Sequence, residues 1–252
     1  MLPLLLDSAT IDMYLLDGVD VRIRLELANN NWLLKSNVNV SGISLNVNKA
    51  KLWIDRVTPH YNALSALNHS LVVKPIEYIY HKTLQKTYVV GAGESSIMID
   101  QPFGTCIPEK MDMIILDMAS FSGSSSRNGL YFDHANITNI HVTVNGSTLY
   151  NINTLFPSKY SQSYYETQKT LGIDKENMIT FDTYKKGRTV FSFNFVNESV
   201  EETLPVEVTA NSRLNLKFGS NLTTPSVIIL LADTTGLLSI DNQRFVTCDV
   251  RG

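Results

Sequence analysis

The sequence has few cysteines, and they lack the spacing of a metal or redox site. Cys106 and Cys248 are the only two in 252 residues, and they stand far apart. A disulfide framework needs several cysteines, and a zinc site needs close pairs such as CxxC. The sequence therefore argues against both, and we expect two buried free thiols.

Neither sign of charge dominates. Lys plus Arg number 21 against 24 Asp plus Glu, a formal net charge of -3. A protein that binds nucleic acid or an anionic membrane directly usually carries a strong basic excess. We therefore expect no direct nucleic-acid partner.

Long hydrophobic runs are also missing. No stretch approaches the roughly 20 apolar residues of a membrane span. Residues 1–6 are apolar but lack a basic flank and are stopped by Asp7, so they do not read as a signal peptide, and we expect a soluble compartment. The six N-x-S/T triplets are then better explained by an Asn-rich and Ser/Thr-rich composition than by glycosylation; they begin at Asn39, Asn68, Asn136, Asn145, Asn197 and Asn221.

Catalytic and cofactor motifs are lacking as well. The histidines show no HxH or HExxH spacing; they are His60, His69, His81, His134 and His141. The adjacent pair Asp133 and His134 is better explained by local loop hydrogen bonds than by catalysis. We expect no enzyme, no cofactor, no metal and no small-molecule substrate, and we assign no site residue.

Two glycine-containing stretches also favour a structural role. Gly91 and Gly93 lack the third glycine and the helix of a dinucleotide site, which favours a bulge or a tight turn. Residues 120–129 contain several serines but no GxSxG elbow, and they predict an exposed loop.

What the sequence does contain is strand patterning. Residues 19–27 alternate apolar and charged side chains without interruption, which predicts a half-buried strand. Residues 43–54 alternate too, but the phase slips at Asn48 and Lys49, which predicts a bulge or a break there.

Many further strands are indicated. They cover residues 76–80, 87–90, 97–99, 111–118, 138–144, 190–195, 206–209, 214–218, 227–232 and 245–250. Asn145 and Gly146 predict a hairpin turn. Residues 227–231 are apolar at every position, which predicts a central strand covered on both faces.

Two helices are expected. Thr58 as N-cap and Pro59 at the first helical position begin a short helix over residues 59–68. Residues 157–172 predict an inserted helix, with Ser163 and Glu166 as a capping box and Gly172 at the C-cap. Strands predominate, without βαβ alternation or repeats, so the fold class is an all-β antiparallel two-sheet sandwich, and 1–252 is expected to be a single domain.

Several phrases of the sequence resemble a known family. Phe103-Gly104 is closed by Pro108-Glu109-Lys110, a hydrophobic strand and a small-residue loop follow, then Asn128-Gly129-Leu130-Tyr131-Phe132-Asp133-His134, and finally Val144-Asn145-Gly146. In this order they resemble the C-terminal half of the double jelly-roll major capsid proteins of polinton (Maverick), adintovirus and polinton-like viruses. Family members carry an additional N-terminal jelly roll, and this chain starts where that one ends.

The resemblance implies a viral-capsid-type jelly roll and a structural role in the virion, assembled in the host cytoplasm or nucleus. It also implies self-association into a homotrimeric capsomer and contacts with other capsid proteins. Loops at residues 120–129 and 151–177 are the candidates for those contacts. A carbohydrate-binding, lectin-like jelly roll remains the alternative, and a cupin-like enzyme on the same fold is a weaker third.

Overall fold

The computed structural model describes residues 13–36, 42–172, 179–195 and 210–248. Contacts divide the chain into two compact units. Unit 1 comprises residues 1–27, 46–82 and 235–251, and unit 2 comprises essentially residues 28–45 and 83–234. The expectation of one domain over 1–252 stays a prediction.

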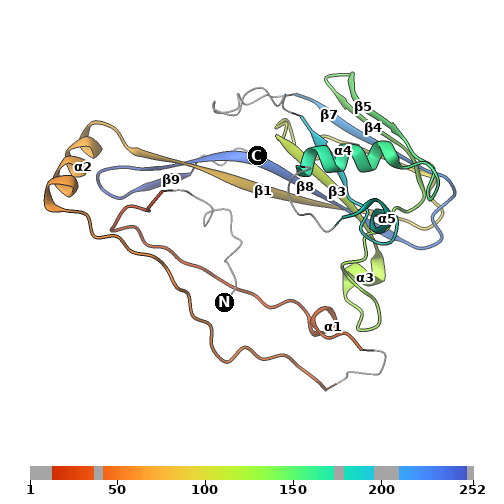
Figure 1. Cartoon of the computed structure of the whole chain (residues 1–252), viewed down its shortest axis with the longest axis horizontal. Helices are drawn as coiled ribbons and strands as arrows, with labels where there is room; N and C mark the ends of the chain where they lie inside the picture. Colours follow the sequence, from red (N-terminus) through yellow and green to blue (C-terminus); the bar gives the residue numbers. More distant parts are fainter. Residues whose placement is uncertain (1–12, 37–41, 173–178, 196–209, 249–252) are drawn as a thin grey trace. The chain divides into compact units, whose positions relative to one another are not determined.

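Within the described residues, eight strands form two four-stranded sheets, and a ninth extends one of them (Figure 1). The strands are β1 (Ile76–Val90), β2 (Ser96–Asp100), β3 (Lys110–Asp117), β4 (Ile137–Val144), β5 (Ser147–Asn153), β6 (Phe191–Asn194), β7 (Ser212–Phe218), β8 (Ser226–Ile240) and β9 (Val246–Cys248). One sheet has the order β1-β8-β3-β6 with β9 beside β8, and the other has the order β2-β7-β4-β5.

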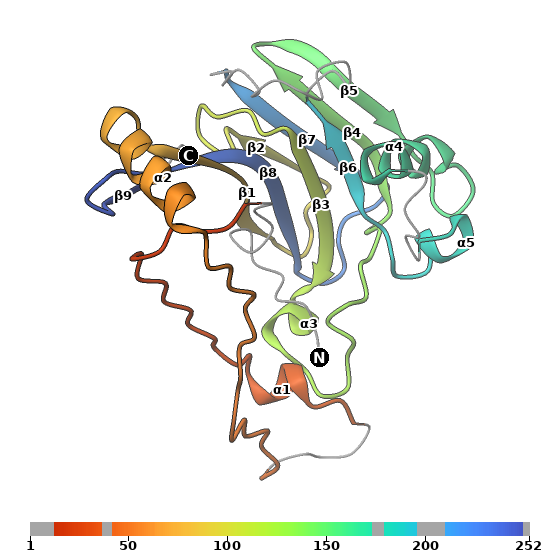
Figure 2. The same ribbon diagram turned by 60° about the vertical axis from the view of Figure 1, so that its left-hand side comes forward.

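This order is that of a jelly roll. The first strand pairs with the eighth, the second with the seventh, the third with the sixth and the fourth with the fifth. Such nested pairing arises when one long antiparallel ribbon folds over into two facing sheets. The predicted all-β antiparallel two-sheet sandwich is confirmed, and Figure 2 shows its two layers.

The core of unit 2 lies between the sheets and follows the two-residue period of the strands. Met111, Met113 and Ile115 of β3 point into it, and each is at most 2% exposed. The facing sheet contributes Leu214 and Leu216 of β7, both equally buried. Because successive side chains of a strand point to opposite faces, these alternating residues bury one face of each sheet.

Strand β8 is covered on both faces, as predicted. Ile228 and Leu230 enter the core between the sheets, while Val227 and Ile229 are also buried on the opposite face. The second face packs against residues of α3 (Met118–Ser122) and against Phe132. Its neighbours β1 and β3 make β8 an interior strand of the sheet.

The prediction of a half-buried strand over residues 19–27 is wrong. These residues belong to no sheet of the described chain, and their apolar side chains are exposed. The same holds for residues 43–54, where no bulge can be assigned because no ladder forms. Alternating apolar and polar residues give a segment one apolar and one polar face. A β-ladder also needs a partner strand that bonds the backbone N–H and C=O groups of the segment.

The other predicted strands are found, mostly longer than expected. The segments 76–80 and 87–90 are parts of the single strand β1, and 227–232 is the first half of β8. Strand β5 was missed, although the Asn145-Gly146 turn that leads into it was predicted; both residues have positive φ, at 50° and 79°. The predicted strand 206–209, Asn39, Asn197 and residues 1–6 lie outside the described residues.

Both predicted helices exist with shifted bounds. Helix α2 (Tyr61–Val73) has His60, not Thr58, as N-cap, because the His60 Nδ1 accepts from the Asn62 N–H at 3.3 Å. Helix α4 (Ser161–Leu171) ends at Gly172 as predicted, but the capping box is wrong: its N-cap is Tyr160, and Ser163 is buried inside the helix. The short helices α1 (Asn30–Leu33), α3 and α5 (Phe181–Tyr184) were not predicted.

Unit 1 has a small core of its own. Leu16, Leu71, Tyr78 and Ile240 are its buried members. The Tyr78 hydroxyl accepts from the Leu16 N–H at 3.1 Å and donates to the Tyr14 carbonyl at 3.2 Å. These bonds attach the start of the described chain to β1 within this unit.

Neither cysteine forms a disulfide in the described residues, but the expectation that both are buried is wrong. Cys106 is half-buried, and Cys248 is exposed. Cys248 lies on the short strand β9, which pairs with β8 alone, so one side of it faces solvent.

Candidate functional site

The chain just after the first loop, residues 120–129, meets the chain just after the helical insertion in unit 2. The Phe132 N–H, just after the first loop, donates to the Gly187 carbonyl at 2.9 Å, and the Thr189 N–H donates to the Phe132 carbonyl at 3.3 Å. Gly187 to Thr189 is the chain that leaves α5 and closes the helical insertion. The segment that follows the loop after β3 is therefore bonded to the segment that follows α5.

Trp32 of α1 holds the first loop. Its indole N–H donates to the Phe121 carbonyl at 3.0 Å, and a Cβ added at Gly129 would lie 2.5 Å from the indole ring. Only a glycine fits beneath this ring. The expectation of an exposed loop over 120–129 is therefore partly wrong, since Ser120 and Gly129 are buried.

Lys35 and Ser36 continue this attachment. The Lys35 ammonium donates to the Ser124 carbonyl at 2.9 Å and lies 5.4 Å from the centre of the Trp32 ring, a cation–π distance. The Ser36 N–H donates to the Ser125 carbonyl at 2.9 Å. Sequence reasoning missed this contact because Trp32 and Phe121 are 89 residues apart.

A polar hollow lies where these segments meet. It has a volume of about 510 Å³, and its lining is Lys35, Ser36, Ser125, Ser126, Arg127 and Asn128. Asp117 pairs with Arg127 and offsets its charge. The other polar groups of the lining also bond within the chain: Lys35 donates to the Ser124 carbonyl, and the Asn128 side chain accepts from the Leu130 N–H at 2.9 Å.

An aromatic cluster anchors the helical insertion. Phe156, Tyr160, Tyr184 and Phe191 stack or meet edge to face, with ring centres 5.3 to 6.4 Å apart. Tyr184 is fully buried and donates its hydroxyl to the Val190 carbonyl at 2.9 Å. Burial raises the pKa of Tyr184 to about 12, so the phenol stays protonated and keeps this hydrogen bond.

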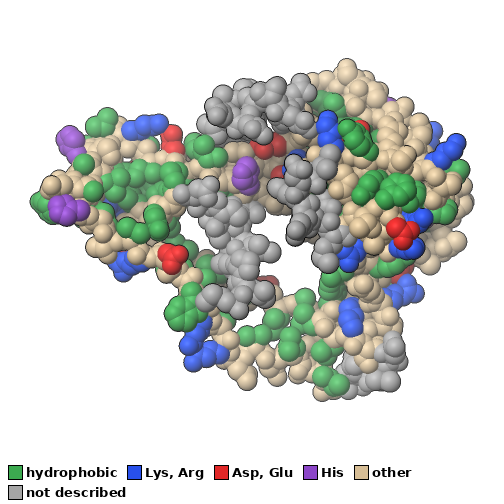
Figure 3. Space-filling view, in the orientation of Figure 1, with side chains coloured by type: hydrophobic (Ala, Val, Ile, Leu, Met, Phe, Trp, Pro, Cys, Tyr) green, Lys and Arg blue, Asp and Glu red, His purple; other side chains and the backbone are tan. Residues whose placement is uncertain are grey.

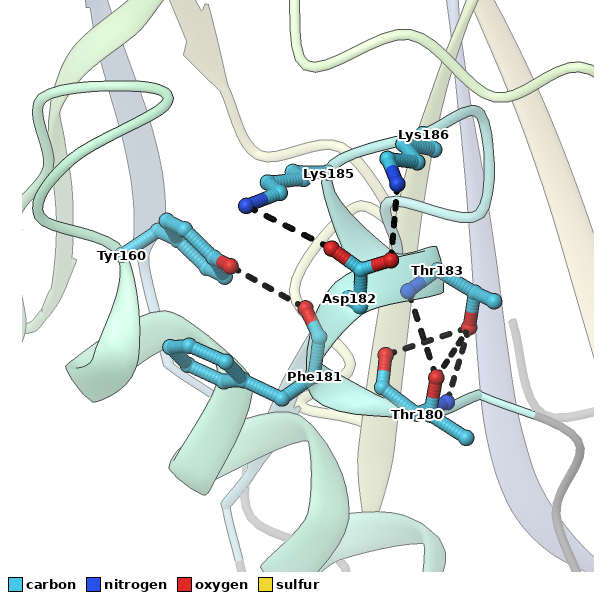
Figure 4. A network of polar contacts seen from close by, with 7 residues as sticks. All are labelled: Tyr160, Thr180, Phe181, Asp182, Thr183, Lys185 and Lys186. Atoms are coloured by element: carbon cyan, nitrogen blue, oxygen red, sulfur yellow. Dashed lines mark hydrogen bonds and ion pairs between the residues drawn. The ribbon is translucent and has the colours of Figure 1, made fainter.

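The surface of the insertion carries a small charged network on α5 (Figure 4). Asp182 accepts from Lys186 at 2.7 Å and pairs with Lys185 at 3.5 Å, and the hydrogen bond from Lys186 lowers the pKa of Asp182. Thr180 and Thr183 form a capping box that begins the helix. The Tyr160 hydroxyl donates to the Phe181 carbonyl at 3.1 Å, which ties α5 to the start of α4.

Asp133 and His134 make the local loop bonds expected from the sequence. The Asp133 carboxylate accepts from the Ala135 N–H at 3.1 Å, and His134 Nδ1 accepts from the Asn136 N–H at 2.9 Å. The imidazole stacks on Phe156 at 4.3 Å, and burial lowers the pKa of His134. The lowered pKa favours the neutral His134 ring, which accepts this hydrogen bond from the Asn136 N–H directly before β4 begins.

The glycine pair near residue 91 forms a tight turn between β1 and β2, as predicted, with Gly93 at φ 91°. The described residues contain no group of three or more His, Cys, Asp or Glu side chains placed to hold a metal ion. Within the same residues, no helix is long and apolar enough to cross a membrane. The sequence assigned no catalytic, cofactor-binding or metal-binding residue, and that stays a prediction.

Comparison with known proteins gives structural likenesses alone. No family model and no curated protein sequence matches the chain. Among solved structures, it is similar to a chain of the Sputnik virophage, with TM-score 0.43, 15% identity and coverage of 71% of this chain and 40% of that one. The mavirus major capsid protein has a TM-score of 0.42 and 8% identity, and the match covers 70% of this chain and 41% of that one. The PBCV-1 virus capsid has a TM-score of 0.42 and 10% identity, and the match covers 71% of this chain and 52% of that one.

This chain thus spans about half of those proteins, or less. Its own strand order, described above, is what assigns the jelly roll.

Proposed function

We propose that this chain is a structural protein of a viral capsid, related to the double jelly-roll major capsid proteins of polinton, adintovirus and polinton-like viruses. It builds the virion shell through contacts with copies of itself and with other capsid proteins, and it performs no catalysis. The observation that carries the proposal is the position of the family-like phrases within the jelly roll.

Each of those phrases supplies a core or turn residue of the fold. Phe103 is 5% exposed in the core, and Gly104 has a φ of 69° in the turn that precedes β3. Gly129 lies beneath Trp32, and Asn145-Gly146 forms the β4–β5 hairpin. The resemblance therefore concerns architecture rather than an active site, which favours a structural role.

The surface formed by residues 120–129 and by the insertion within 151–177 is the proposed contact between subunits. It carries exposed apolar side chains, among them Leu155 and Tyr165. The proposed capsomer is a homotrimer in which residues 1–252 act as one domain. Assembly takes place in the host cytoplasm or nucleus, without direct nucleic-acid contact or a small-molecule substrate.

Light scattering on the purified full chain, with electron microscopy of the same sample, tests this proposal. We expect trimers or larger closed assemblies. Tyr165→Asp should weaken them, while Met98→Asp, an equally exposed position on β2, should not. A strict monomer at high concentration contradicts self-assembly of this chain.

One observation favours a carbohydrate-binding module as a second candidate. The polar hollow lined by Lys35, Ser36 and residues 125–128 offers hydroxyl and amide groups of the kind that bind sugars. Screening the chain against immobilised glycans, with and without calcium, tests this function. Glycan binding by a monomer that Ser125→Ala and Asn128→Ala abolish would favour it over the shell protein.

A further inference from the structure

Helix α2 begins with a histidine at the position that Ser, Thr, Asp or Asn usually takes. The N-cap is His60, whose Nδ1 atom accepts from the Asn62 N–H at 3.3 Å. The His60 carbonyl also accepts from the Leu64 N–H at 3.0 Å, which starts the helical hydrogen bonding. A hydroxyl or amide cap keeps its charge state near neutral pH, whereas an imidazole does not. The bond that caps α2 therefore depends on protonation.

Protonation of His60 removes this cap. The Nδ1 atom accepts a hydrogen bond only while it carries no proton, and both ring nitrogens of a protonated imidazole are donors. The charged ring would also lie at the N-terminus of α2, where the helix dipole disfavours positive charge. The folded state therefore favours the neutral ring. The stabilisation from the cap is present at higher pH and is lost as the pH falls.

The charged groups around α2 do not offset a positive charge on His60. The helix contains no Asp, Glu, Lys or Arg. The titratable and charged groups on α2 and on the segments around it in unit 1 are Asp17, Arg56, Tyr61, His69, Lys74, Glu77, Tyr78, Asp241 and Arg244. Within the described residues, none of them forms an ion pair with His60; Asp17 pairs with Arg56, and Glu77 pairs with Lys74 after the helix ends.

Loss of the cap affects the core of unit 1, because α2 supplies part of it. Leu71 is 4% exposed and is a buried member of this core, and Leu67 packs against it. Helices in proteins are stabilised mainly by packing of their apolar face, and a core this small offers little of it. Opening of α2 therefore also weakens the packing around Leu16, where the start of the described chain is attached.

A similar bond in unit 2 gives an internal comparison. His134 Nδ1 accepts from the Asn136 N–H, again two residues ahead, but the His134 ring is half-buried and stacked on Phe156. His60 is exposed, and Figure 3 shows histidine side chains at the surface over α2. Protons therefore reach His60 without unfolding of the chain. Since His134 also contributes to the pH dependence of stability, the effect of His60 must be measured on α2 itself.

We propose that His60 is an acid-sensitive cap, which holds α2 on unit 1 near neutral pH and lets the helix open more often when the imidazole is protonated. The cap bond to Asn62 carries this proposal, together with the absence of an acidic residue from the first turn of the helix. This inference goes beyond the shell function and does not rest on it.

Hydrogen exchange of the full chain tests the proposal. The quantity compared is the protection factor, the intrinsic exchange rate of an amide divided by its observed rate, for amides of residues 65–73 of α2. Between about pH 7.5 and about pH 5.5 we expect these protection factors to fall roughly threefold to tenfold. The amides of β3 and β7 serve as a reference, since they report on the fold of unit 2.

Three variants separate the cap from other effects of acid. His60→Asn keeps a cap that does not titrate, so its α2 should stay protected at both pH values, whereas His60→Ala should show low protection at both. The unaltered chain should match His60→Asn at the higher pH and His60→Ala at the lower one. His69→Gln removes the other histidine of the helix and should keep the fall.

Three results would overturn the proposal. The first is the same fall in the His60→Asn variant, because another group would then cause it. The second is equal protection of α2 in His60→Asn and His60→Ala near neutral pH, because the cap would then hold nothing. The third is a fall that His69→Gln abolishes. Unchanged protection of β3 and β7 in each variant shows that the chain still folds.

Discussion

In unit 2 the alternating residues of eight strands meet between two sheets, whereas in unit 1 equally regular alternation ends in solvent. Among the described residues, the main core of unit 2 holds 21 buried apolar residues, and that of unit 1 holds four. Residues 214–218 of β7 and residues 19–27 have the same pattern, yet Leu214 is 1% exposed and Leu25 is 69% exposed. Alternation of apolar and polar side chains therefore gives a segment one face that can be buried. Whether that face is buried depends on whether a partner strand and a facing sheet are present.

The largest expected effect comes from removing a core ring in unit 2. Phe193→Ala should destabilise the fold by roughly 3–5 kcal/mol, because Phe193 is fully buried and its loss leaves a cavity. Ile23→Ala in unit 1 is the matched control and should change stability by less than about 0.5 kcal/mol. Chemical denaturation measures both. Equal losses would show that residues 19–27 are buried in solution and would break the comparison.

The next effect concerns a glycine that the loop of unit 2 requires. Gly129→Ala should cost roughly 1–3 kcal/mol, because the new methyl group would overlap the Trp32 ring. Trp32→Ala removes the obstacle, so the double variant should lose less than the sum of the two single losses. Thermal melts of the unaltered protein, the two single variants and the double variant measure the coupling energy between Gly129 and Trp32. Additive losses would contradict the packing of α1 on the loop.

A smaller effect is expected at a buried carboxylate on β3. Asp112 lies opposite Ser192 in register, and its Oδ1 atom and the Ser192 hydroxyl are both buried; a contact with this hydroxyl offsets only part of the effect of burial on the Asp112 pKa. Burial raises the pKa of Asp112, so the ionised form destabilises the fold at neutral pH. Asp112→Asn should therefore stabilise the protein by roughly 1 kcal/mol at pH 7.

The pH dependence gives the control for this prediction. As the pH falls through the raised pKa toward the ordinary value of 3.8, Asp112 takes up its proton in the folded protein, and the penalty disappears. The advantage of Asp112→Asn should shrink over that range in denaturation curves. A constant advantage down to pH 4 would point to packing rather than charge.

The smallest effect is the titration of His134. Because burial lowers the pKa of His134 below 6.5, the unfolded chain takes up the proton first as the pH falls. The contribution of neutral His134 to the free energy of unfolding should be fully present above pH 6.5 and should decline below it. His134→Phe keeps a ring to stack on Phe156 and should remove this part of the decline. The same slope in both proteins would mean that another group causes it.

Sequence reasoning predicted much of the jelly roll and little of the candidate surface. The strands with one or two apolar faces were found, and the Asn145-Gly146 hairpin followed from its turn residues. The helix starts were misplaced because the N-caps were assigned to Thr58 and Ser163 from sequence motifs alone. In the structure the N-caps are His60, which accepts from the Asn62 N–H, and Tyr160. Trp32 and the aromatic cluster around Tyr184 gave no local signal, since their partners are distant in sequence.

The sequence by itself determined which side chains can share a face, because the two-residue period of a strand is local. It also determined where the chain can turn, through residues such as Gly93 and Asn145 that adopt positive φ. The tertiary structure alone decided which amphipathic strands obtain partners and which glycine must lie under a ring. Hydrogen bonds between strands and contacts between rings join residues far apart in the chain, and a local pattern carries no information about whether the partner is present.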